Sequence, residues 1–193
     1  MQKISQTQLK LAKQLLDDGA VIAVPTETVY GLAAKFGHPS AVTKLLRIKD
    51  RKAKNDDKFL ALMLPSVAEL KNYARLSPLA IKIAQRHFPG ELTMILPKTP
   101  LAFKQDYCAR IEMGIRIPDH EYMLKLLKIT GPLLVTSANL RGEPPCQTSV
   151  EIEKQLPAIG VVITGKAGGS LPSTVISIEG DKLTTLRQGT LVF

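Results

Sequence analysis

The sequence has few of the residues on which several common kinds of site depend. It contains no tryptophan, two cysteines and three histidines, and only 5% of its residues are aromatic. The cysteines are isolated and form no Cys-x-x-Cys pair, which argues against a disulfide scaffold and a tightly bound structural metal. The scarcity of aromatic residues argues against a surface on which nucleic-acid bases stack.

Long hydrophobic runs are also missing. No apolar stretch approaches the roughly 18 residues that a membrane-spanning helix needs, and the N-terminal residues lack the apolar core of a secretory signal. The unpaired Cys108 and Cys146 suit a reducing compartment. We therefore expect a cytoplasmic protein.

The chain does have a globular composition and a strong positive charge. Its 193 residues are 45% hydrophobic, which predicts one domain over residues 1–193 with a sizeable core. The formal net charge is +9. This excess favours an anionic partner such as a nucleotide, pyrophosphate or RNA, but it does not choose among them.

Apolar periodicity predicts helices and strands that alternate along the chain. Helices are expected at 5–18, 39–48, 66–73, 77–88, 118–127 and 149–156. Strands are expected at 20–24, 59–64, 92–96, 111–117, 133–136, 161–164, 174–178 and 183–186, with 190–193 as a weaker candidate. This order indicates an α/β domain, and the close spacing of the last strands indicates a mixed sheet flanked by helices.

Two of the predicted strands end in similar polar clusters. The strand at 20–24 stops at Pro25 and is followed by Thr26, Glu27, Thr28 and Tyr30, and the strand at 133–136 by Ser137 and Asn139. Open α/β sheets bind ligands beyond the carboxyl ends of their strands, so both clusters are candidates for one cleft. Ordinary polar turns are the alternative.

Two sets of cations suggest anion binding. Lys49 and Arg51 lie in a basic run, where an ammonium and a guanidinium two residues apart could hold a polyphosphate. A solvated loop is the alternative. Arg116 lies in an apolar strand and needs a carboxylate partner, either from a substrate or from an Asp or Glu of the chain.

A glycine-rich segment, 165–174, resembles a phosphate-binding loop only superficially. The four residues between Gly160 and Gly165-Lys166 predict a strand, and Ala167 stands where a P-loop has Ser or Thr. We expect a flexible loop that closes over a ligand instead. No serine nucleophile motif is present.

These stretches together resemble the YrdC-like family of threonylcarbamoyl-AMP synthases, in its short bacterial form. The matching segments follow the family's order: Pro25–Gly31, Lys49 with Arg51, Pro89-Gly90 before Leu92-Thr93, Arg116–His120, Ser137 with Asn139, Ser173–Val175, and Leu186-Arg187 with Gly189.

The resemblance implies a YrdC-like fold with a basic concave cleft and a specific reaction. L-threonine, bicarbonate and ATP would give threonylcarbamoyl-AMP and pyrophosphate for the t6A modification of tRNA, with Mg²⁺ accompanying the ATP. It also implies tRNA or double-stranded RNA, and the downstream tRNA threonylcarbamoyl-transferase complex, as candidate partners.

The resemblance also carries residue roles. It places Thr26, Arg116 and Ser173 around L-threonine, with Arg116 on the carboxylate. It places Lys49, Arg51, Ser137, Asn139 and Arg187 around ATP, with Lys49 and Arg51 on the phosphates as the catalytic cations.

The sequence departs from the family pattern at several positions. Lys52 and Phe59 replace prolines, Glu91 stands where proline is common, and Met63 occupies a position often held by histidine. Two alternatives stay open: a non-catalytic RNA-binding module of the same fold, and a carbamoyl-transfer relative with another acceptor.

Overall fold

Ten strands form one mixed sheet in the computed structural model, which describes residues 1–49, 60–105 and 110–193. The strand order is β1-β8-β2-β3-β7-β4-β6-β5-β9-β10. The strands are β1 (Gln2–Ile4), β2 (Ile22–Val24), β3 (Gly31–Lys35), β4 (Ala61–Met63), β5 (Leu92–Pro97), β6 (Glu112–Arg116), β7 (Leu133–Ser137), β8 (Val161–Ile163), β9 (Thr174–Glu179) and β10 (Lys182–Arg187). Parallel pairs such as β2–β8 and β4–β6 lie among antiparallel pairs such as β3–β7, which confirms the predicted mixed sheet.

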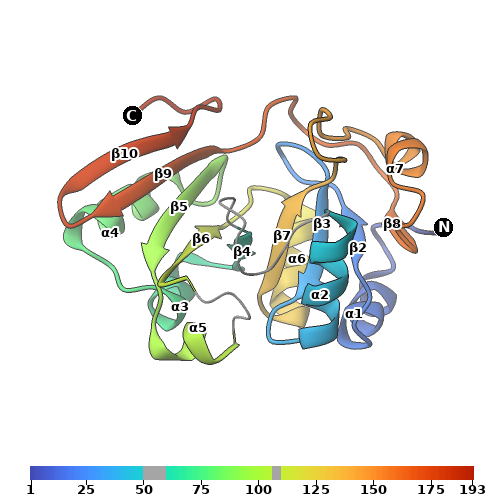
Figure 1. Ribbon diagram of the computed structural model, residues 1–193, viewed down its shortest axis with the longest axis horizontal. Coiled ribbons are helices and arrows are strands. Elements are labelled where there is room, and N and C mark those ends of the chain that lie inside the picture. The colour runs from blue at the N-terminus through green and yellow to red at the C-terminus, as the bar shows by residue number, and fades with distance from the viewer. Residues whose placement is uncertain (50–59, 106–109) are drawn as a thin grey trace.

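Short helices flank this sheet (Figure 1). They are α1 (Leu9–Asp17), α2 (Pro39–Ile48), the 3-10 turn η1 (Val67–Glu69) leading into α3 (Leu70–Tyr73), α4 (Pro78–His87), α5 (Pro100–Gln105), α6 (Glu121–Thr130) and α7 (Ser149–Gln155). Capping explains several starts. Ser77 Oγ accepts from the Ala80 N–H at 3.2 Å, and Pro78 occupies the first turn of α4, where its missing N–H costs nothing.

The strands β2 and β3 bury both of their faces. Alternate residues point to opposite sides of a sheet, so Ile22, Val24 and Ala33 pack with α1 and α6. Ala23, Leu32 and Ala34 pack with α2 on the other side. Full burial of one such leucine or isoleucine contributes about 1.5–3 kcal/mol, so these two layers fix the position of the turn between β2 and β3.

The other half of the sheet contains β5, β6, β9 and β10, with α3, α4 and α5 nearby on the left in Figure 1. The periodicity predicts an inward stripe on α4 that includes Ile81, but Ile81 is 42% exposed. The other two residues of the predicted stripe, Ala84 and Phe88, are buried, and Ala80 and Ile83 are buried with them.

Several elements differ from those predicted. The first helix begins at Leu9 rather than near Ser5, because Gln2–Ile4 pairs with β8 as an edge strand. The strand β3 and the helix α5 were not predicted, and 190–193 is not a strand. Since β3 runs antiparallel to β2, the polar cluster after Pro25 connects two neighbouring antiparallel strands.

Within the described ranges, none of the helices has the length and the apolar character that crossing a bilayer requires.

Candidate functional site

A cavity of about 460 Å³ lies against the sheet, a size typical of small-molecule sites. Residues of β3, β7, β4, β6, β5, β9 and β10 line it. Seven of the residues predicted from the sequence are among them: Thr26, Lys49, Arg116, Ser137, Asn139, Ser173 and Arg187. The eighth, Arg51, lies outside the described residues.

The two polar strand ends meet because β3 and β7 are neighbours. Their antiparallel register pairs Gly31 with Ser137, which brings the segment after Pro25 beside the segment after β7. The Ala138 N–H donates to the Tyr30 carbonyl oxygen at 2.8 Å, and so joins the two segments directly. The expectation that both clusters line one cleft is confirmed.

Lys49 is held against the end of β7. Its Nζ donates to the carbonyl oxygens of Ser137 at 2.9 Å and Asn139 at 2.5 Å, and to Asn139 Oδ1 at 2.6 Å. Ser137 Oγ donates to the same Oδ1 at 2.8 Å, and Asn139 Nδ2 donates to the Glu143 carbonyl oxygen at 2.7 Å. One ammonium, one hydroxyl and one amide therefore form a preorganised polar cluster.

Arg116 has the carboxylate partner that a buried guanidinium needs. Its Nη2 donates to Glu27 Oε1 at 2.7 Å and to Thr28 Oγ1 at 2.9 Å. The exposed fractions of the Arg116 and Glu27 side chains are 5% and 13%. Glu27 Oε1 also accepts from the Asp119 N–H at 3.0 Å. The alternative of an ion pair within the chain is confirmed, and Arg116 lines the cavity as well.

The pair leaves two buried polar atoms unpartnered. Within the described residues, Glu27 Oε2 and Arg116 Nε have no hydrogen-bond partner. A buried polar atom without a partner is costly, and such atoms in a native structure often mark a functional position.

The hydroxyls after Pro25 mainly hold the shape of this segment. Thr26 Oγ1 donates to the Val29 carbonyl oxygen at 2.7 Å and accepts from the Thr28 N–H at 3.2 Å. Tyr30 donates to the Ile163 carbonyl oxygen at 2.9 Å, and burial raises the pKa of Tyr30 to about 12. The predicted polar turn and the predicted cavity wall are thus the same structure.

The glycine-rich segment, residues 165–174, packs against this turn and donates backbone hydrogen bonds to it. The Gly168 N–H donates to the Thr26 carbonyl oxygen at 2.9 Å, and the Gly169 N–H donates to that of Thr28 at 3.0 Å. A Cβ on Gly168 would lie 3.0 Å from the Glu27 carbonyl oxygen, so a side chain at this position would require the turn to shift by a few tenths of an ångström. The expectation of a flexible loop that closes over a ligand is therefore wrong for this part, which is tied to the cavity wall.

A second guanidinium lies at the other side of the cavity. Arg187 Nη2 donates to the Ser173 carbonyl oxygen at 2.8 Å and to Ser173 Oγ at 3.2 Å. Partial desolvation, and then the positive charge of Arg116, lower the pKa of Arg187 from its ordinary value. The two guanidinium groups are therefore close enough to repel each other, and an anion between them would relieve that repulsion.

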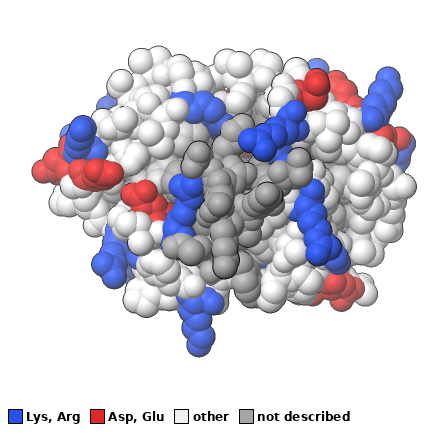
Figure 2. All heavy atoms as spheres, in the orientation of Figure 1, with Lys and Arg blue, Asp and Glu red and all other residues white. Residues whose placement is uncertain are grey.

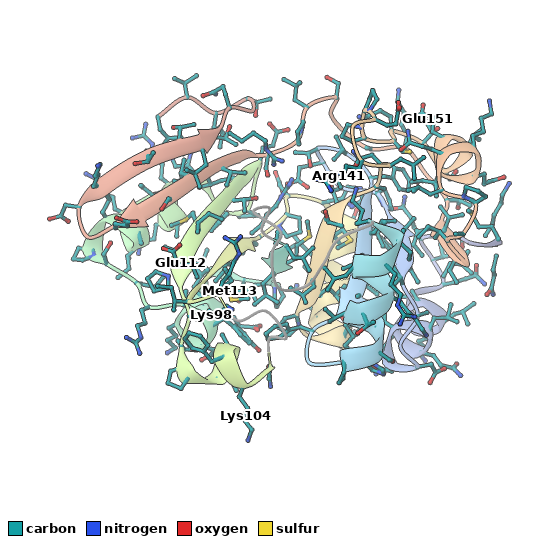
Figure 3. All side chains as sticks on the ribbon, in the orientation of Figure 1. Lys98, Lys104, Glu112, Met113, Arg141 and Glu151 are labelled. Carbon is teal, nitrogen blue, oxygen red and sulfur yellow. The ribbon has the colours of Figure 1, made fainter. Side chains whose placement is uncertain are left out.

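Two polar lining residues were not identified from the sequence. Arg141 follows β7 and is labelled near the upper end of that strand in Figure 3. Thr93 lies on β5 with its hydroxyl 2.8 Å from Ser173 Oγ. A single polar residue in the apolar run 92–96 was the available signal for Thr93, as it was for Arg116 in its own strand.

The cavity is lined by four basic side chains, those of Lys49, Arg116, Arg141 and Arg187, and no carboxylate is among its described lining residues. In the view of Figure 2, Lys and Arg side chains surround the middle of the face that is shown, and acidic side chains lie mostly nearer the edge of that face. In the described ranges, no group of three His, Cys, Asp or Glu residues could hold a metal ion. This donor set suits anionic groups and hydroxyls, and it does not suit a protein-held Mg²⁺.

Comparison with known proteins gives concordant matches over most of the chain. The family model Sua5_yciO_yrdC, described as "Telomere recombination", matches residues 14–189. The chain is 35% identical to the threonylcarbamoyl-AMP synthase of Bacillus subtilis over 187 residues, covering 94% of the chain but 53% of that relative. It is 33% identical to the enzyme of the same name from Vibrio parahaemolyticus over 180 residues, covering 90% of the chain and 95% of the relative.

A solved structure gives the same picture for the fold. Sua5 of P. abyssi, in a crystal structure complexed with L-threonine, superposes with a TM-score of 0.85 at 29% identity. The match covers 96% of this chain and 55% of the Sua5 chain.

Proposed function

The chain belongs to the Sua5_yciO_yrdC family, and from that premise we propose that it is an L-threonylcarbamoyladenylate synthase, a nucleotidyltransferase. It converts L-threonine, bicarbonate and ATP to threonylcarbamoyl-AMP, pyrophosphate and water. The threonylcarbamoyl-AMP synthases of Bacillus subtilis and Vibrio parahaemolyticus match 94% and 90% of the chain. The observation that carries the proposal is the single cavity that gathers Lys49, Arg116, Arg187 and the Ser137–Asn139 turn.

The reaction consists of two bond-forming steps. The threonine amine attacks bicarbonate, and loss of water gives a carbamate. A carbamate oxygen then attacks the α-phosphorus of ATP, and the bond from that phosphorus to the bridging oxygen of pyrophosphate breaks. Such a displacement needs positioning and neutralisation of charge more than a covalent nucleophile. The basic, hydroxyl-lined cavity is suited to this work.

The proposed residue roles are those that the family resemblance implies, and they are supported by the seven of these eight residues that line one cavity. Arg116 binds the threonine carboxylate, with Ser173 and Thr26 beside it. Because the Thr26 hydroxyl is already used within its turn, Thr26 contributes its methyl group or backbone. The residues around ATP are Lys49, Arg51, Ser137, Asn139 and Arg187, with Lys49 and Arg51 as the cations that neutralise the phosphates.

Binding of ATP involves an exchange at Lys49. Its ammonium donates to three protein oxygens, so a phosphate oxygen takes the place of one of them. A Mg²⁺ ion that accompanies ATP would be held by the triphosphate, because the described lining residues offer no carboxylate.

The wider setting follows from the product. Threonylcarbamoyl-AMP is consumed in the t6A modification of tRNA, so we expect the protein to work in the cytoplasm and to supply the tRNA threonylcarbamoyl-transferase complex. A direct contact with tRNA or double-stranded RNA is a further part of the proposal. We also propose that residues 1–193 act as one domain, since the sheet joins strands from both ends of the chain.

Pyrophosphate release tests the proposed reaction. We expect release from ATP that requires both L-threonine and bicarbonate, with loss of activity when either is omitted. Release that is indifferent to threonine would contradict this substrate and favour a carbamoyl-transfer relative with another acceptor. Absence of release, together with tight RNA binding that weakens as salt rises, would favour the non-catalytic module.

A further inference from the structure

Four side chains form a row across the floor of the cavity. Met63 on β4 pairs with Arg116 on β6, and Thr93 on β5 pairs with Val175 on β9. The antiparallel register of β5 and β6 pairs Met94 with Ile115, which places Thr93 opposite Arg116. The order across the sheet is therefore Val175, Thr93, Arg116, Met63, and all four line the cavity. Directly opposed residues have Cβ atoms about 5 Å apart.

The hydroxyls of Thr93 and Ser173 form a pair beside this row, and the pair has one hydrogen-bond donor to spare. Its hydroxyl is 2.8 Å from Ser173 Oγ, and Ser173 Oγ also accepts from Arg187 Nη2 at 3.2 Å. Each hydroxyl has one O–H donor and two lone pairs. One O–H of the pair is donated to the other hydroxyl. The second O–H has no partner among residues 1–49, 60–105 and 110–193.

The neighbours of Thr93 and Arg116 in the row are apolar. Met63 is 3% exposed, and Ile95, two residues after Thr93 on the same face of β5, is 1% exposed. Val175 opposite Thr93 adds a third apolar side chain to this part of the cavity lining, and the Arg187 guanidinium is the polar neighbour of the hydroxyl pair. A dry surround of this kind strengthens a hydrogen bond to a ligand and penalises a ligand that cannot form it.

We infer that Thr93 is a specificity-determining residue that recognises the side-chain hydroxyl of the amino-acid substrate. The inference rests on the proposed function. With the substrate carboxylate on Arg116, a short side chain reaches the adjacent position of the row, where the hydroxyls of Thr93 and Ser173 lie. Val175, which lies next to Thr93 on the side away from Arg116, contacts the methyl group of the same side chain. The floor of the cavity thus matches the carboxylate, hydroxyl and methyl of L-threonine in turn.

The substitution Thr93→Val tests this inference because it keeps the side-chain shape and removes the hydroxyl. The compared substrates are L-threonine and L-2-aminobutyrate, which lacks only the hydroxyl. A site built around a hydroxyl rejects such an analogue strongly, so we expect the wild-type protein to prefer threonine by at least about 100-fold in kcat/KM. In Thr93→Val this ratio falls at least about tenfold, while the KM for ATP stays within about twofold.

Two further variants sharpen the test. Thr93→Ser keeps the hydroxyl and should keep the preference for threonine. Thr130→Val removes another buried hydroxyl, which donates to the Leu126 carbonyl oxygen away from the cavity, and should leave the preference unchanged. If Thr93→Val does not fold, as judged by its melting transition, Thr93→Ala takes its place.

The outcomes separate this inference from the proposed reaction. An unchanged threonine preference in folded Thr93→Val would overturn the role of Thr93 and leave the synthase intact. If the wild-type protein releases no pyrophosphate with any amino acid, the proposed reaction fails. Calorimetric binding of L-threonine and L-2-aminobutyrate still decides the role of Thr93 in that case, because loss of discrimination in Thr93→Val supports it and retained discrimination overturns it.

Discussion

At the scale of single residues, Arg116 has two tasks that can be separated. It neutralises the buried carboxylate of Glu27, and it is proposed to bind the threonine carboxylate at the cavity. A substitution that removes the guanidinium affects both tasks at once. A second substitution that removes the charge of Glu27 affects only the first.

We predict that Arg116→Met raises the KM for threonine about 10- to 100-fold, since a charge-assisted hydrogen bond to the substrate is lost, and leaves the KM for ATP nearly unchanged. It also lowers the free energy of unfolding by about 3–5 kcal/mol, because Glu27 stays buried without its cation. Steady-state kinetics and urea unfolding measure the two effects.

The double variant Arg116→Met, Glu27→Gln serves as the control. It should recover most of the lost stability, because the unpaired charge is gone, while the KM for threonine stays high. Recovery of both stability and KM would show that Arg116 is only a structural cation.

At the scale of elements, the glycine-rich segment supports the turn that carries Glu27. Its backbone approaches this turn so closely that a Cβ at Gly168 would lie 3.0 Å from the Glu27 carbonyl oxygen. We predict that Gly168→Ala lowers the free energy of unfolding by about 1–3 kcal/mol, because the added Cβ must displace the Glu27 backbone. The KM for threonine should rise as well, since Arg116 is positioned by Glu27.

Gly160, eight residues before Gly168 in the sequence, provides a matched control. A Cβ there would meet no atom within 4 Å, so Gly160→Ala should leave stability and KM close to those of the wild type. Equal effects of the two substitutions would show that the close approach at Gly168 does not matter.

Helices and strands with a regular spacing of apolar residues, or with proline or glycine at their ends, were predictable from the sequence. The helix α2 begins and ends as expected, because Pro39 starts it and an apolar stripe runs along it. The strand β1 was missed because it is short and pairs with β8, which is distant in sequence. The strand β3 was missed because its sequence, GLAAK, is poor in residues that favour strands, and it is held in the sheet by β2 and the distant β7. Local pattern contains no information on such partners.

The same distinction applies to the site. Lys49, Ser137 and Asn139 stood out through their residue types, and the resemblance joined them into one site. Their actual contacts depend on the position of α2 against the end of β7, which no local pattern describes. Thr93 was not predicted as a site residue, because its position beside Arg116 depends on the register between β5 and β6.

At the scale of the whole molecule, alkaline pH should destabilise the fold. Burial raises the pKa of Cys146 from its ordinary value of 9.0 to about 11, with the charge of Glu151 as a smaller cause. Between these pH values the unfolded thiol loses its proton and the folded thiol keeps it. The unfolded state then binds fewer protons, so the free energy of unfolding falls by about 2–3 kcal/mol as pH rises through this window.

Chemical denaturation across this window measures the slope, with Cys146→Ala as the comparison. The variant loses the contribution of the thiol, so its stability should depend less steeply on pH even though its stability at neutral pH is lower. Tyr30 contributes to both proteins at the upper end of the window, because its pKa is also raised, to about 12. Identical slopes would exclude Cys146 as a source of the alkaline instability.

The order of strands in the sheet also determines when each strand can pair with its neighbours as the chain is synthesised. The strands β1 and β2 both take β8 as a neighbour, so Gln2–Ile4 cannot pair in the sheet until Val161–Ile163 have been synthesised. The strand β5 likewise waits for β9. Ser173 and Arg187 are synthesised after most of the other lining residues, so the cavity is incomplete until both have been added to the chain. Long-range pairing of this kind folds slowly, and partly synthesised chains expose unpaired strand edges that a growing cell has to protect from aggregation.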